Sequence, residues 1–153
     1  MVDDARFEDG QARPLNLGAE DTEDLKVISA LVQDAVLPLS ELKWKASARQ
    51  FAMLINRFRW EEGGRGTERV QSVLLFEDVM SVSSQGIDRK DKEMVISLLS
   101  VAFEPGEDGM GHMMLTLAGD GSIRLAVEAI GVSLKDVTRP YLAPSKSKPS
   151  HDI

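Results

Sequence analysis

Residues 51–60, which read FAMLINRFRW, constrain the fold of this chain more than any other stretch. Side chains of an extended backbone alternate between two faces. Both faces are apolar here, with Phe51, Met53 and Ile55 on one and Leu54, Phe58 and Trp60 on the other. Because a strand with two apolar faces is usually covered on both sides, we expect a central strand of a sheet.

The same stretch becomes polar and basic toward its end. Asn56, Arg57 and Arg59 interrupt the apolar pattern, and Arg49 lies just before it. Guanidinium groups grip carboxylate or phosphate groups at two points, and Trp60 could stack against a planar group. These five residues therefore predict a basic rim that holds an anionic group or an acidic partner. The alternative is a solvated basic edge that discourages sheet-to-sheet aggregation.

Charge and composition exclude several classes of protein. The formal net charge of −7 argues against general nucleic-acid binding, although residues 42–69 hold seven basic against three acidic side chains. The absence of cysteine removes disulfides, thiolate metal sites and cysteine nucleophiles. No apolar run approaches the roughly 20 residues of a membrane helix, and residues 1–10 do not resemble a signal peptide. We expect a cytoplasmic protein without a membrane segment.

One amphipathic helix is predicted near the N-terminus. Asp21 suits the capping position before the first turn, and Leu25, Ile28 and Val32 recur at helical spacing. Pro38 should end this helix after about four turns, because the residue before a proline avoids helical angles.

After the helix the period changes to two, which predicts about seven strands besides a short one at 15–17. No second helical pattern separates them as a crossover, so the strands should be mostly antiparallel. We predict an α+β fold, in which the N-terminal helix packs on a curled sheet or partial barrel. The predicted strands are residues 42–46, 51–60, 70–76, 79–84, 94–103, 112–118 and 123–128.

The remaining segments complete the expected organisation. One globular domain spans residues 15–139, between disordered tails at 1–14 and 140–153 that are rich in charge or in proline and serine. Residues 133–137 are expected to form a short helical turn. Trp44 is expected in the core rather than at a ligand site, because it alternates with Leu42 and Ala46.

Patterns for catalysis and metal binding are weak. His112 has no second histidine or carboxylate at metal-ligand spacing. The glycine-rich loop at residues 61–67 lacks the lysine and serine or threonine of a phosphate-binding loop, and no serine lies in a Gly-x-Ser-x-Gly setting. We predict no metal, no cofactor and no catalytic residue. A small enzyme with a site near His112, and a homodimer formed through sheet edges or apolar patches, remain as alternatives.

Three blocks of sequence occur together in the chain. They are DLxVISAxxQDAV at residues 24–36, NRFRWE at 56–61 and IRLxVExI at 123–130. Together they resemble a family of small alphaproteobacterial proteins that is classed as a domain of unknown function. The resemblance covers about residues 15–141 and implies a bacterial, cytoplasmic, single-domain protein. It supplies no catalytic residues, so the residues themselves favour a non-catalytic binding or protein-interaction module.

Overall fold

The computed structural model describes residues 14–62 and 68–142. Residues 1–13 and 143–153 of the expected tails, and most of the expected loop at 61–67, lie outside these ranges. Residues 141–142, which were included in the expected C-terminal tail, instead form a strand that pairs with residues 68–69. The described residues form the helix α2 (Thr22–Leu31), three short 3-10 helices, and the strands β1 (Asn16–Ala19), β2 (Val36–Pro38), β3 (Leu42–Lys45), β4 (Gln50–Phe58), β5 (Glu68–Phe76), β6 (Val79–Gln85), β7 (Val95–Pro105), β8 (Gly111–Leu117), β9 (Ser122–Val127), β10 (Val132–Asp136) and β11 (Tyr141–Leu142).

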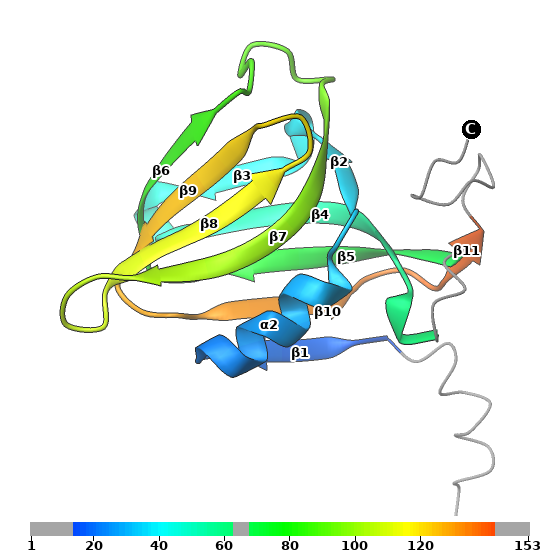
Figure 1. The fold of residues 1–153 in the computed structure, drawn as a ribbon. Coiled ribbons are helices and arrows are strands. Elements are labelled where there is room, and N and C mark those ends of the chain that lie inside the picture. Colours follow the sequence, from blue (N-terminus) through cyan, green and yellow to red (C-terminus); the bar gives the residue numbers. More distant parts are fainter. Residues whose placement is uncertain (1–13, 63–67, 143–153) are drawn as a thin grey trace, which may run out of the picture.

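All of these strands belong to one antiparallel sheet with the order β1-β10-β5-β4-β2-β7-β8-β9-β6, while β3 pairs with β4 and β11 with β5. Figure 1 shows the sheet curling around a common interior, with α2 beside β1. The prediction of one helix on a curled antiparallel sheet is confirmed. The predicted strand number is wrong, because the described part of the chain contains eleven strands rather than about seven.

The strands that the sequence did not predict are short, and pairing with neighbouring strands stabilises them. Residues 133–137 were expected to form a helical turn, but β10 runs between β1 and β5 and buries Val132 and Leu134. The backbone of Val36–Pro38 pairs with both β4 and β7. Because these residues form a strand, the helix α2 ends at Leu31 and not at the residue before Pro38. Two to five residues are too few for an alternating pattern to show in a sequence.

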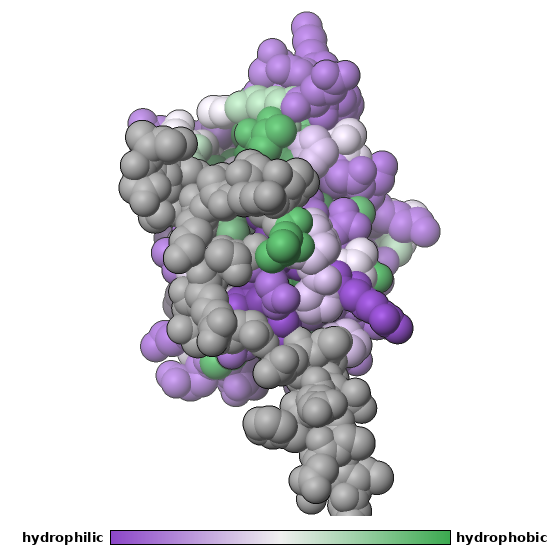
Figure 2. All heavy atoms as spheres, turned by 90° about the vertical axis from the view of Figure 1, so that its right-hand side faces the viewer, coloured by the Kyte–Doolittle hydropathy of each residue, from purple (hydrophilic) through white to green (hydrophobic). Residues whose placement is uncertain are grey.

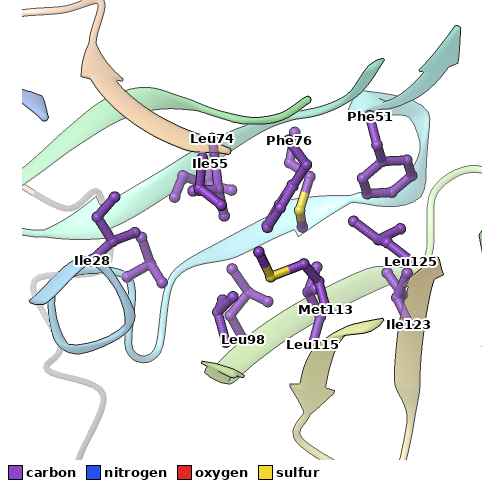
Figure 3. Packing of buried hydrophobic residues seen from close by; sticks show 14 of the residues in the cluster. Ile28, Phe51, Ile55, Leu74, Phe76, Leu98, Met113, Leu115, Ile123 and Leu125 are labelled. Carbon is purple, nitrogen blue, oxygen red and sulfur yellow. The ribbon is translucent and has the colours of Figure 1, made fainter. Parts of the chain in front are cut away.

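The interior is lined by one face of each long strand and by the buried face of α2. Figure 3 shows Ile28 of α2 and Ile55 and Leu74 of β4 and β5 approaching Leu98 and Leu115 of β7 and β8. All five side chains are at most 1% exposed, so a single hydrophobic core joins the helix to both halves of the sheet.

The sheet does not close into a barrel, and α2 fills one of its two openings. The helix packs against β7 and β1, and the hydroxyl of Ser29 accepts a hydrogen bond from the backbone N–H of Val101 at 2.9 Å. The second opening lies between β3 and β6. There the N–H of Val79 donates to the carbonyl of Arg49 at 2.9 Å, so the two edges meet only at this end.

The N-terminus of α2 provides a test of the local structure. The carboxylate of Asp21 accepts a hydrogen bond from the N–H of Asp24 at 2.8 Å. Asp21→Ala should lower the free energy of unfolding by about 1 kcal/mol, because it leaves a helix N–H without its partner. Asp21→Asn keeps the acceptor and should stay close to the parent in urea unfolding. Equal losses in both variants would show that charge, rather than capping, stabilises this end.

Candidate functional site

Arg57 lies in the protein interior and is 0% exposed. Its Nε donates to Ser72 Oγ at 3.1 Å, and its Nη2 lies 3.0 Å from Asp136 Oδ2. Its Nη1 and Nη2 donate to the two carboxylate oxygens of Glu61, both at 2.9 Å. A buried guanidinium is stable only when its charge and its N–H groups are matched in this way. Arg57 therefore joins β4, β5 and β10 and is not part of an exposed rim.

The strand alternation explains this position. Phe51, Met53 and Ile55 face the core, and Arg57 is the next residue of β4 on that face. Ser72 occupies an inward position of β5 in the same way, and it lies directly opposite Asp136 of β10. A polar residue at an inward position of an alternating strand was the sequence signal for this network.

Arg59 is also buried, at 5% exposed, and its Nη1 lies 2.6 Å from a carboxylate oxygen of Glu68. Arg49 is half-exposed, but Glu128 neutralises it at 2.5 Å. The prediction that Arg57 and Arg59 form an exposed basic rim with Arg49 is therefore wrong. Each guanidinium is matched by an acidic side chain near it in the fold: Arg57 and Arg59 both lie within 4.0 Å of the carboxylate of Glu61, whereas Arg49 pairs with Glu128.

Asn56 and Trp60 lie at the other end of β4 from Arg49. The hydroxyl of Tyr141 donates to Asn56 Oδ1 at 2.7 Å, and the indole N–H of Trp60 donates to the carbonyl of Gln33 at 2.9 Å. On the face shown in Figure 2, described apolar residues are few and are separated by hydrophilic ones. These contacts do not test a binding role for Asn56 or Trp60, which stays a prediction.

Arg69 lies near the same end of β4 as Trp60. Its guanidinium lies 4.1 Å from the centroid of the Phe58 ring, a cation–π contact, and the ring of Phe58 packs against that of Trp60. Burial lowers the pKa of Arg69, and burial raises the pKa of the neighbouring Tyr141. Arg69 Nε is buried and makes no hydrogen bond to the described residues. Arg69 does not line the cavity described below, and its guanidinium packs against the ring of Phe58.

His112 lies on β8 beside Arg124, whose Nη2 is 3.4 Å from His112 Nδ1. Arg124 also pairs with Glu104 at 3.2 Å, and both of those side chains are substantially exposed. His112 is not among the residues that line the cavity described next. The described residues also contain no group of three or more histidine, aspartate or glutamate side chains that could hold a metal ion.

A cavity of about 320 Å³ occupies the opening between β3 and β6. Its size is at the lower end of the range for small-ligand pockets. Seven of its eleven lining residues are apolar, two are serines, and two cations stand on the loop that follows β6. The lining residues are Leu39, Leu42, Trp44, Phe51, Val82, Ser83, Ser84, Ile87, Arg89, Lys92 and Ile123.

Trp44 is 38% exposed and lines this cavity, so the expectation that it lies in the core is wrong. Trp44 pairs with Phe51 and Leu42 pairs with Met53, whereas Ala46 begins a short 3-10 helix. The difference arises because β3 has only β4 beside it among the described strands. No strand covers its other edge, and the indole borders the opening.

Arg89 and Lys92 differ from the arginines of β4 because neither makes an ion pair with a described residue. Their loop is nevertheless held in place. The N–H of Ser40 donates to the carbonyl of Lys92 at 3.0 Å, and the N–H of Leu39 donates to the carbonyl of Met94 at 2.9 Å. No aspartate or glutamate occurs among the described lining residues. The cavity therefore combines an apolar wall with two positioned cations that no carboxylate of its wall neutralises.

The buried network predicts a large loss of stability. Arg57→Met should lower the free energy of unfolding by about 3–5 kcal/mol, because it leaves the carboxylate of Asp136 buried without its counter-ion. Arg49→Met is the matched control, and it should cost less than about 1 kcal/mol because the pair with Glu128 is exposed. Chemical denaturation measures both values. Similar losses in the two variants would contradict the structural role assigned to Arg57.

The network also predicts a dependence of stability on pH. Partial burial acts to raise the pKa of Glu61, but hydrogen bonds and charge from Arg57 outweigh it and hold that pKa below its ordinary value of 4.5. The resulting stabilisation is present above this ordinary value and is lost as the pH falls through the lowered pKa of the folded state. The stability difference between the parent and Glu61→Gln should therefore shrink between about pH 6 and pH 3.

Urea unfolding at several pH values measures this difference. Glu107→Gln, at an exposed turn position, provides the control and should differ little from the parent throughout. A difference between parent and Glu61→Gln that stays constant with pH would contradict the ion pair between Glu61 and Arg57.

Comparisons with known proteins bear on the family and leave the activity open. No helix in the described ranges is both long and apolar enough to cross a membrane. No curated protein and no solved structure matches the chain. A family model described as "Protein of unknown function (DUF2948)" matches residues 15–151, and this range contains the curled sheet, the buried network and the cavity. The chain belongs to the DUF2948 family.

Proposed function

We propose that this protein is a non-catalytic binding module that holds an anionic group carried on an apolar body. The cavity between β3 and β6 is the site that supports this proposal. The anion-binding role expected from the sequence is part of the proposal, but Arg89 and Lys92 of the cavity, rather than Arg57 and Arg59, supply the positive charge. The observation that carries it is a cationic edge on an apolar wall without a lining carboxylate.

The apolar part of a ligand would contact the wall formed by Leu42, Trp44 and Phe51. The half-exposed indole of Trp44 offers a flat surface at the mouth of the cavity. Removing such surfaces from water stabilises a complex by roughly 25 cal/mol for each Å² of apolar area buried. The apolar wall thus supplies binding free energy, and the charged edge selects the ligand.

The anionic part would lie against Arg89 and Lys92. A guanidinium binds a carboxylate, phosphate or sulfonate through a planar fork, and a lysine adds a point charge. Because their loop is hydrogen bonded to the segment before β3, a ligand does not have to order the backbone that carries these two side chains. This preorganisation favours binding.

The proposal does not include catalysis, because the described lining residues offer no base to activate a hydroxyl group. A hydroxyl nucleophile such as Ser83 or Ser84 needs a neighbouring base to remove its proton. No histidine, aspartate or glutamate occurs among the described residues that line the cavity. His112, the residue that the enzyme hypothesis depends on, lies on β8 with Arg124 and Glu104.

The dye 8-anilinonaphthalene-1-sulfonate tests the proposal, because it joins an apolar aromatic body to one sulfonate. Titration should show saturable binding with a rise in dye fluorescence. The double variant Arg89→Glu/Lys92→Glu should weaken the affinity about tenfold or more, since both charge contacts become repulsive.

The matched control is Lys90→Glu/Lys135→Glu, which makes the same change in net charge at two exposed lysines outside the cavity. It should leave the affinity within about twofold of the parent. Circular dichroism must show that both double variants are folded. Equal weakening in the two variants, or none in either, would exclude this cavity as the binding site.

A further inference from the structure

The strands β3 and β6 each have a free edge at the cavity. Among the described strands, β3 pairs only with β4, and β6 pairs only with β9. Free edges carry unpaired N–H and C=O groups that are ready to pair with another extended chain. Here residues of both edge strands line one opening, which distinguishes this site from an ordinary sheet margin.

The lining residues indicate that the edge of β6 borders the cavity. Val82, Ser83 and Ser84 are consecutive, and all three line it. Neighbouring side chains of a strand point to opposite faces, so a cavity in contact with only one face would take alternate residues. Contact with all three places the cavity beside the strand, where its backbone hydrogen-bonding groups lie.

The directions of the two edge strands fit one missing strand. The path from β3 to β6 through β4, β2, β7, β8 and β9 consists of antiparallel pairs only. The number of these pairs is even, so β3 and β6 point the same way around the sheet. A single strand antiparallel to both would continue the alternation across this opening.

We propose that the opening between β3 and β6 receives an extended peptide segment of a partner protein, which pairs with both edges as an added strand. This inference rests on the proposed function and names the class of ligand. The hydrogen bond between Val79 and Arg49 closes one end of the opening between β3 and β6, and β3 is four residues long. About four residues of the peptide, each spanning roughly 3.3 Å, are therefore ordered.

The faces of β3 specify the chemistry of that segment. Leu42 and Trp44 line the cavity, while the alternate residues Lys43 and Lys45 are exposed. Side chains that lie opposite each other on neighbouring strands interact in pairs. The inserted segment therefore has apolar residues facing inward and acidic residues facing outward against the two lysines, so it alternates apolar with acidic residues. An acidic group at its end reaches Arg89 or Lys92.

An acetylated and amidated hexapeptide of alternating glutamate and valine is the probe. In a Trp60→Phe background, Trp44 is the remaining tryptophan and reports binding by its fluorescence. Alternate amides of a strand point to opposite edges. N-methylation of the odd-numbered or of the even-numbered amides should therefore each weaken binding at least tenfold. Loss with only one methylated set would place the peptide on a single edge and overturn the proposed pairing with both strands.

Charge reversal separates this inference from the proposed function. Lys43→Glu/Lys45→Glu should weaken the peptide at least fivefold and change dye binding by less than about twofold. The control Lys90→Glu/Lys135→Glu should affect neither probe. If the dye binds but the peptide does not, the inference fails and the proposed function stands, whereas absence of both kinds of binding overturns both.

Hydrogen exchange provides the second readout. On addition of the peptide, the amides of β3 and β6 that point into the opening should exchange at least tenfold more slowly, and the dye should not produce this protection. Protection of the same amides in the free protein, together with a dimer in sedimentation, would mean that a second copy occupies the edges. Either that result or unchanged exchange with bound peptide would overturn the inference.

Discussion

The geometry of this sheet depends on the hydrogen bonds and ion pairs of the buried Arg57 guanidinium. Removing a charged group from water costs several kcal/mol, so the position is stable only when partners surround it. Those partners come from separate parts of the chain, with Ser72 on β5, Asp136 on β10 and Glu61 just after β4. Asp136 also accepts a hydrogen bond from the backbone N–H of Leu15 at 2.9 Å. One cation therefore fixes β10 against β5 and fixes the chain that enters β1.

The same constraint divides the molecule into a closed side and an open side. Around Arg57, hydrogen bonds and ion pairs saturate the ends of β4, β5 and β10. The helix α2 covers the opening between β1 and β7, where Ser29 supplies a hydrogen-bond acceptor to the edge of β7. Nothing comparable joins β3 to β6 beyond the single contact at Val79. The remaining opening is thus a consequence of how the other edges are satisfied.

Two sets of described basic residues differ in what they contact. Arg49, Arg57 and Arg59 are matched by acids, which suits a structural role. Arg89 and Lys92 stand beside apolar side chains at the cavity, without an ion pair to a described residue. A matched charge stabilises the fold and offers little to a ligand, while an unmatched charge beside an apolar wall can contribute to binding. The distribution of partners, rather than the density of basic residues along the chain, favours the cavity as the site of recognition.

Hydrophobic periodicity predicted the long elements well, because each buries one face over many residues. The helix cap at Asp21 and the strand that begins after Gln50 follow from local sequence alone. The alternation of β3 was visible in the sequence, but its pairing of Trp44 with Phe51 was known only from the structure. Strands such as β2, β10 and β11 were not accessible, because pairing partners distant in sequence stabilise these short segments.

The sequence by itself determined an antiparallel sheet with one N-terminal helix, because local alternation and capping are properties of neighbouring residues. Only the tertiary structure decided which basic side chains have an acidic partner. The two acids that neutralise Arg57, for example, lie 4 and 79 residues away along the chain. Charge density in a sequence window cannot distinguish a solvated arginine from a buried one whose counter-ion arrives from another strand. The cavity, too, exists only where the curled sheet leaves two of its edges apart.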